Sequence, residues 1–209
     1  MKAERLFSEA DKARISATIE AVEKTTAGEI AVMVVDASDT YPEGRVLAGV
    51  LLGGLAALAA ADRLFADSLW HFVPLAAPLA WLTGWASRFL PAVHRLFVPE
   101  TRLEARVQAR ALRAFYEKGL YKTREATGVL FFISLFEHKV WILADKGIYE
   151  KIKPETLQAH AREIANGIGG RRGAEVLCRE IGKVGEVLAR HFPVRPDDTD
   201  ELSNNVIIG

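Results

Sequence analysis

Cysteine is nearly absent from this chain of 209 residues, in which Cys178 is the single one. One thiol can form neither an internal disulfide nor a CxxC redox pair, and it cannot build a cysteine-rich zinc site. An excess of charge of either sign is also missing, because 27 Lys and Arg residues balance 27 Asp and Glu residues. This balance gives no general attraction to polyanions, so no nucleic-acid partner is predicted.

Recognisable catalytic motifs are missing too. The sequence contains no P-loop, GxSxG elbow, HExxH helix or dinucleotide-binding fingerprint. His138 beside Glu137 has the chemistry of a general acid or base, but no nucleophile lies at a recognisable spacing. Residues 1–11 carry charges with no apolar run behind them, which predicts no signal peptide and a start in the cytoplasm. Enzyme catalysis therefore has no positive support from motifs.

Apolar residues, by contrast, are abundant. They make up 50% of a chain that is also 26% charged, and they are concentrated between Val46 and Phe97. Residues 46–61 contain no Asp, Glu, Lys or Arg and would span about 24 Å as a helix. Residues 69–86 again contain none of these four residue types. The sequence thus combines an ordinary charged protein with a segment suited to lipid.

We therefore predict that residues 46–89 form a transmembrane hairpin of two helices. The alternative is a pair of buried helices in a larger soluble fold. Both stretches are apolar on all sides rather than along one stripe, which favours lipid. Trp70 and Trp85 flank the second stretch, as aromatic residues do at membrane interfaces.

Basic residues flank this hairpin unequally. Arg45, Arg88 and Arg95 lie on the side of the remaining chain, whereas Arg63 is alone near the connecting loop. Cytoplasmic segments next to membrane spans carry an excess of Lys and Arg. The pattern predicts that the rest of the chain is cytoplasmic.

Outside the hairpin, residues 1–45 and 90–209 are predicted to form one discontinuous α/β domain, because a hairpin returns the chain to the face where it started. Helices are expected at 8–25 with Ser8 as N-cap, 103–118, 154–165 and 174–190, and strands at 29–36, 128–135 and 139–145. This order predicts a small mixed sheet flanked by helices, with the first two strands parallel and the third antiparallel to both. Residues 192–209 are expected to be an acidic tail.

The helix after the hairpin has an apolar stripe and, on a neighbouring face, a basic stripe. The basic stripe consists of Arg102, Arg106, Arg110 and Arg113. One interpretation is a solvated face balanced by the glutamates of the same helix. The other is contact with anionic lipid headgroups, at about 1 kcal/mol per arginine near the surface.

The predicted strand order brings Glu29, at the start of the first strand, toward Asp145, at the end of the third. Glu150 follows nearby. A hard cation such as Ca²⁺ needs several converging oxygen ligands, which these three acids could supply. Solvated acids at strand ends are the alternative. The tail acids Asp197, Asp198, Asp200 and Glu201 lack the spacing of a twelve-residue calcium loop.

Three segments of the domain resemble the TPM domain family. They are Thr26–Ile30, Thr127–Ser134 and Ile142–Ile148, whose order and spacing agree with the family. That family includes thylakoid-lumen proteins linked to photosystem II repair and many bacterial proteins of unassigned role. The chain is similar to a bacterial membrane branch in which a transmembrane hairpin follows the first strand. The resemblance implies a compact α/β/α sandwich in the bacterial inner membrane.

The resemblance also carries expectations about function. Some family members are reported to bind calcium, and weak acid phosphatase activity is proposed for a plant member. In the better-known branch a Gly-x-Gly stretch follows the third strand, whereas here Asp145 stands at about the first glycine and Gly147 remains. The main hypothesis is a membrane-anchored accessory, scaffold or interaction module that binds Ca²⁺ and an unidentified membrane or cytoplasmic protein. The alternative is a weak metal-assisted acid phosphatase.

Overall fold

The computed structural model of the chain describes residues 2–65, 69–123, 125–170, 172–194 and 205–209. The chain divides into two compact units. Met1–Ser38 and Glu104–Gly209 form the first, named the α/β unit below, and Asp39–Leu103 form the second, named the hairpin unit.

A mixed sheet forms the centre of the α/β unit. Its strands are β1 (Glu29–Val35), β2 (Gly128–Ser134), β3 (Lys139–Ala144) and β4 (Ile207–Ile208), in the order β3-β2-β1-β4. β1 runs parallel to β2, and β2 runs antiparallel to β3. The three predicted strands and their relative directions are therefore confirmed. Every residue of β1 and β2 is buried, because apolar side chains face both sides of the sheet.

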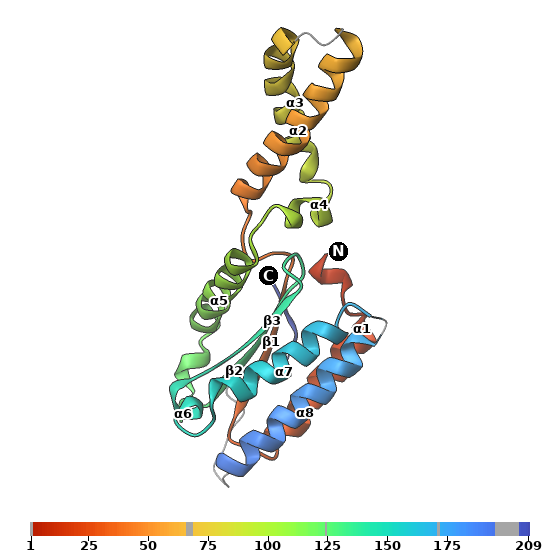
Figure 1. Cartoon of the computed structure of the whole chain (residues 1–209). Coiled ribbons are helices and arrows are strands. Elements are labelled where there is room, and N and C mark those ends of the chain that lie inside the picture. The colour runs from red at the N-terminus through yellow and green to blue at the C-terminus, as the bar shows by residue number, and fades with distance from the viewer. Residues whose placement is uncertain (1, 66–68, 124, 171, 195–204) are drawn as a thin grey trace. The chain divides into compact units, whose positions relative to one another are not determined.

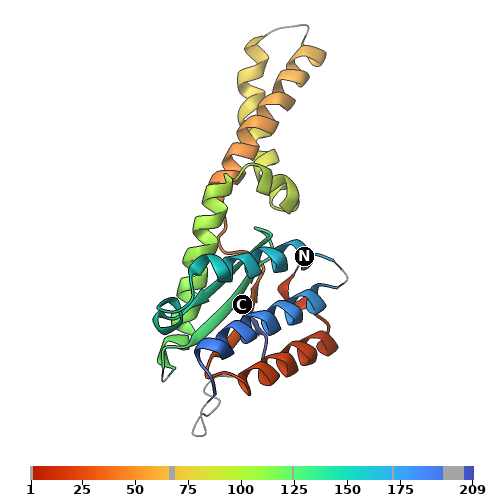
Figure 2. The ribbon, with the colours of Figure 1, turned by 60° about the horizontal axis from the view of Figure 1, so that its bottom comes forward.

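Helices cover both faces of this sheet (Figure 1). α1 (Glu9–Glu23), α7 (Pro154–Gly167) and α8 (Gly173–His191) pack on one face, and α5 (Glu100–Glu117) packs on the other. The two faces of β1 divide between these layers, since Val32 contacts the first and Met33 the second. Both views show α1 beside α8, where the two helices pack against each other (Figure 2). The expected α/β/α arrangement is present.

The ends of these helices follow local sequence signals. Ser8 caps α1: its hydroxyl oxygen accepts from the N–H of Asp11 at 3.2 Å, and the Asp11 carboxylate accepts from the N–H of Ser8 at 3.1 Å. This reciprocal pair confirms the predicted N-cap. Short helices complete the unit: η1 (Ala3–Arg5), η3 (Leu120–Lys122) and α6 (Lys146–Tyr149).

The end of the chain differs from the predicted tail. Pro193 forms a β-bridge with Thr26, and β4 pairs parallel with β1 from Met33 to Val34. Both described ends of the segment 192–209 therefore join the α/β unit, and its last apolar residues complete an edge of the sheet. Two residues are too few for a strand to be recognised from alternation. The acids Asp197, Asp198, Asp200 and Glu201 lie outside the described residues.

The hairpin unit is helical. It contains α2 (Pro42–Leu64), η2 (Leu69–His71), α3 (Phe72–Ser87) and α4 (Pro91–Leu96), and α2 packs against α3. Among the described residues, α2 is the one helix long and apolar enough to cross a membrane, since α3 has 16 residues. The two predicted apolar stretches are thus both helical.

The hairpin unit extends beyond the predicted bounds of 46–89. A ring nitrogen of His94 lies 3.0 Å from the carbonyl oxygen of Tyr41, and Arg102 donates to Glu43 at 3.0 Å. These contacts join the two flanks of the hairpin. Each contact joins residues more than 50 positions apart, so no local sequence pattern predicts it.

Candidate functional site

The sheet edge predicted to carry a cation lies at the amino ends of β1 and β2. Glu29 is opposite Gly128 in the β1–β2 register, and the N–H of Asp145 donates to the carbonyl oxygen of Gly128 at 2.9 Å. Both acids lie at this edge, as the predicted topology requires. However, β2 runs between their strands, and neighbouring strands are about 4.8 Å apart. The two backbones are therefore not adjacent.

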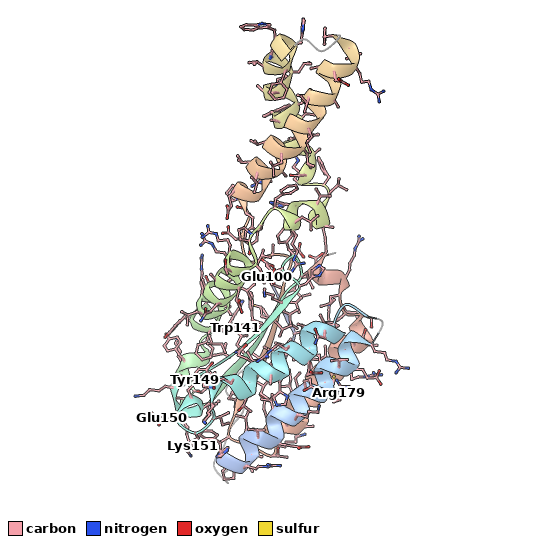
Figure 3. The ribbon with its side chains drawn as sticks, in the orientation of Figure 1. Glu100, Trp141, Tyr149, Glu150, Lys151 and Arg179 are labelled. Carbon is pink, nitrogen blue, oxygen red and sulfur yellow. The ribbon has the colours of Figure 1, made fainter. Side chains whose placement is uncertain are left out.

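Asp145 and Glu150 each interact with Lys146. Asp145 caps α6, because its carboxylate accepts from the N–H of Lys146 at 2.7 Å. Glu150 follows Tyr149 at the end of α6 (Figure 3) and lies 3.8 Å from the Lys146 amine. Within the described part of the chain, no group of three or more Asp, Glu, His or Cys side chains could hold a metal ion. Calcium binding by Glu29, Asp145 and Glu150 stays a prediction.

Gly147, in α6, has a packing role. A Cβ atom at this position would lie 2.7 Å from the carbonyl oxygens of Glu125 and Ala126. The nearby Tyr149 hydroxyl accepts from the N–H of Ala144 at 3.1 Å, and burial raises the pKa of Tyr149. Close backbone approach therefore explains the glycine without a ligand.

A polar cluster that the sequence did not predict lies at the other end of the strands, where β1 and β2 finish. The Ser134 hydroxyl donates to the fully buried Glu137 carboxylate, and the Ser38 N–H donates to the same carboxylate at 2.7 Å. The hydroxyls of Ser38 and Ser134 are 2.9 Å apart. Ligands of open α/β sheets usually bind outside the carboxyl ends of parallel strands, and this rule would have located the cluster. Here the polar atoms fasten the β2–β3 turn to the segment after β1.

A second buried acid lies between α7 and α8. Glu180 is 1% exposed, and its carboxylate accepts from His160 at 2.8 Å, Lys183 at 2.9 Å and Arg179 at 3.0 Å. Burial alone would raise the pKa of this carboxyl. The three hydrogen bonds outweigh burial and lower the pKa to about 2. Arg179 itself reaches the helix surface (Figure 3), so the cluster joins the core to solvent.

The basic stripe of α5 is largely ion-paired. Arg110 and Arg113 both contact Glu117, at 3.2 and 2.7 Å, and these contacts lower the pKa of Glu117. Arg102 pairs with Glu43, while Arg106 is half-buried. This pairing favours the solvated-face interpretation. Contact of Arg102, Arg106, Arg110 and Arg113 with headgroups stays a prediction.

The hairpin unit has an inverted distribution of side-chain size. The buried residues of α2 are all small: Gly44, Ala48, Gly49, Gly53, Ala57 and Ala61. Large apolar side chains of α2 and α3 are exposed instead, including Val46, Val50, Leu51, Leu55, Val73 and Trp81. A water-soluble helix pair would turn these side chains inward.

Close backbone contact explains the small residues. A Cβ atom at Gly49 would lie 2.5 Å from the carbonyl oxygen of Ala80, and one at Gly53 would overlap the backbone of Ala80. The Thr83 hydroxyl lies 3.2 Å from the carbonyl oxygen of Gly49, across the two helices. Small residues every fourth position and polar contacts between helices are typical of transmembrane packing. The signal that could have located this packing is the four-residue spacing of Gly49, Gly53, Ala57 and Ala61 in the sequence.

Comparisons with known proteins show similarity in fold. No family model matches the chain, and no curated protein matches it. The NMR structure of the BA42 protein from the psychrophilic bacterium Bizionia argentinensis sp. nov. is similar, with a TM-score of 0.62 and 20% sequence identity. The match covers 100% of this chain and 99% of the BA42 chain. At this identity the similarity establishes a shared α/β fold and nothing about function.

Proposed function

We propose that this protein is a membrane-anchored accessory or scaffold protein, in which the hairpin unit crosses the bilayer and the α/β unit engages a membrane or cytoplasmic protein. The observation that carries the proposal is the inverted hairpin, with glycine and alanine inside and leucine, valine and tryptophan outside. In water this exposed apolar surface would be unfavourable at about 25 cal/mol per Å². In lipid it is the expected arrangement.

The lengths of the helices support two crossings. α2 has 23 residues, which corresponds to about 34 Å at 1.5 Å per residue. α3 alone is shorter, but η2 precedes it without a break, and Leu69–His71 with Phe72–Ser87 reach about 30 Å together. The hydrocarbon core of a bilayer is about 30 Å thick. Pro78 lies inside α3, where lipid tolerates it better than water does.

The charges at the helix ends support a cytoplasmic α/β unit in the bacterial inner membrane. Arg45 lies in the first turn of α2, and Arg88 is the C-cap of α3, so both mark the same end of the antiparallel pair. Arg63 lies at the other end. The excess of arginine at the first end favours its cytoplasmic placement.

We prefer the accessory role to a weak acid phosphatase because the two fully buried acids have structural partners. Glu137 accepts from Ser134 at the end of β2 and from the N–H of Ser38 after β1, and Glu180 accepts from three basic side chains. A phosphatase needs a nucleophile or positioned water beside a metal or cationic clamp. Hydrolysis of a generic phosphate ester by the purified protein, lost on Asp145→Asn, would instead support the phosphatase.

Carbonate extraction of membranes tests the anchor. The full-length chain should stay in the pellet, and a chain in which Glu43 is joined directly to Val98 should move to the supernatant. A full-length chain recovered in the supernatant would contradict the proposal.

Cysteine labelling of whole cells tests the orientation, in a Cys178→Ser background. An impermeant maleimide should label Trp70→Cys, at the far end of the hairpin, and should not label Ala17→Cys on α1. The reverse pattern would place the α/β unit on the outside.

A further inference from the structure

A groove runs along the outside of the hairpin unit at its arginine-bearing end. It has a volume of about 480 Å³ and is lined by Pro42, Arg45, Val46, Val50, Ala80, Trp81, Gly84, Trp85 and Arg88. This volume is within the roughly 300–1,000 Å³ of small-molecule sites. The close approach of α2 and α3 at Gly84 forms its floor, because a Cβ atom there would lie 3.0 Å from the carbonyl oxygen of Arg45. Larger residues at this crossing would fill the groove.

The walls of the groove are apolar along the helices. Trp81 is 72% exposed, and Val46 and Val50 are exposed beside it. These side chains offer a surface along which an extended hydrocarbon chain could lie. Trp85 lies one turn nearer the end of α3, and tryptophan is enriched in the headgroup region at the ends of transmembrane helices.

The end of the groove is cationic and has no acidic partner of its own. Neither Arg45 nor Arg88 contacts a carboxylate among the residues that the structure describes. The nearest acid in the first turn of α2 is Glu43, which is occupied by Arg102 at 3.0 Å. The guanidinium of Arg88 stacks 4.4 Å from the Trp85 ring and 4.7 Å from the Phe89 ring, which orients it without neutralising it.

Two unneutralised guanidinium groups at the end of an apolar groove match the chemistry of an anionic phospholipid. Guanidinium groups bind phosphate oxygens well, and basic pockets between transmembrane helices on the cytoplasmic side bind acidic headgroups. The amino end of α2, which lies at this same end, adds partial positive charge. All groove residues belong to the hairpin unit, so the site needs no contribution from the α/β unit.

We propose that this groove binds one anionic glycerophospholipid, with its phosphate between Arg45 and Arg88 and an acyl chain along Val46, Val50 and Trp81. The site rests on the proposed membrane anchor and gives it a preference for acidic lipid. The basic stripe of α5 is not required, because Arg102, Arg110 and Arg113 contact glutamates.

Native mass spectrometry of the full-length protein tests this site. The protein is released from mild detergent containing equal amounts of phosphatidylglycerol and phosphatidylcholine with identical acyl chains. The wild type should retain phosphatidylglycerol preferentially. The double variant Arg45→Gln/Arg88→Gln should lose about 25-fold in this preference, at about fivefold per arginine.

Matched variants separate the groove from general charge. Arg63→Gln removes an exposed arginine from the other end of α2 and should leave the preference unchanged. The charge-conserving Arg45→Lys/Arg88→Lys should recover most of it. A wild type that retains both lipids equally would overturn the proposal, and so would an equal loss in Arg63→Gln. Displacement of the lipid by millimolar inorganic phosphate would overturn the assignment to a lipid.

The same protein variants show whether the lipid site fails alone or together with the membrane anchor. Arg45→Gln/Arg88→Gln should still sediment with carbonate-washed membranes, because its helices remain apolar. A variant that sediments without any change in lipid preference overturns the lipid site alone. A wild type that does not sediment overturns both.

Discussion

The two units of this protein place large apolar side chains in opposite positions. In the α/β unit Leu130 is fully buried, and in the hairpin unit Leu55 is 65% exposed. The buried positions of α2 contain only glycine and alanine, where those of the sheet contain valine, isoleucine and phenylalanine. The α/β unit thus encloses its large apolar side chains, whereas the hairpin unit has the distribution that lipid favours. A leucine therefore packs in the core of the α/β unit, whereas a leucine of the hairpin unit faces the surroundings of the protein.

The largest contrast is expected from removing the same side chain in each unit. Leu130→Ala should lower the free energy of unfolding of the α/β unit by about 2–5 kcal/mol, because it leaves a cavity in the core. Leu55→Ala should change it by less than about 0.5 kcal/mol, because this side chain does not pack inside the protein. Denaturant unfolding in detergent, followed by circular dichroism, measures both. Equal losses would mean that Leu55 is buried and that the comparison is wrong.

Acid should act mainly on the α/β unit, through Glu180. The pKa of this carboxyl is lowered from its usual 4.5 to about 2, so its stabilisation is complete above pH 4.5 and is lost as pH falls from 4.5 toward 2. The lowered pKa corresponds to about 3 kcal/mol at neutral pH. Glu180→Gln should remove this amount at pH 7, and the two proteins should converge toward pH 2.

Glu186→Gln is the control, because Glu186 is exposed on the same helix. Unfolding curves of the three proteins between pH 2 and 7 give the comparison. A pH-independent difference between wild type and Glu180→Gln would assign the effect to packing rather than to charge.

Two adjacent glycines test the close packing of the hairpin. Gly53→Ala should destabilise the helix pair by about 1–3 kcal/mol, because the added methyl overlaps the backbone of Ala80. Gly54→Ala meets no atom within 4 Å and should stabilise α2 by up to about 1 kcal/mol. Thermal unfolding in detergent measures both changes. If both variants behave alike, α2 and α3 do not pack as described.

Calcium should have the smallest effect. An ion bound by Glu29 and Asp145 would stabilise the α/β unit by RT ln(1 + [L]/Kd), or about 0.4 kcal/mol when its concentration equals Kd. Asp145→Asn should abolish this gain with little effect on the calcium-free protein, because the asparagine side-chain oxygen can still cap α6. Melting curves with calcium, magnesium and chelator provide the measurement. Identical wild-type curves in all three conditions would remove the cation from the proposed function.

Much of the α/β unit was predictable because its signals are local. Ser8 with Asp11 marks the start of α1, and the continuous apolar runs from Glu29 and Gly128 mark two strands buried on both faces. The relative directions of the strands then followed from the lengths of their connections. β4 was missed because it is two residues long and depends on tertiary contacts, namely its pairing with β1 and the packing of Ile207 against the core.

The candidate sites were less predictable. The Glu29–Asp145 edge followed from strand order, but only the tertiary structure shows that β2 separates the two strands and that Asp145 caps α6. Glu180 looks like any surface acid in an amphipathic helix. Its burial depends on α7, whose His160 lies 20 residues earlier in the chain.

The sequence by itself determined the features that depend on local composition and spacing. These are the apolar segment, the two buried strands and the amphipathic faces of α5 and α8. Hydrophobic periodicity and helix capping act over a few residues, so they can be read directly. The tertiary structure decided which polar groups meet, as with Ser38 and Glu137, and which faces remain uncovered. It alone showed that the close packing of Gly49 against Gly84 turns large side chains outward and leaves Arg45 and Arg88 at one groove. These features depend on contacts between distant segments, which no local pattern specifies.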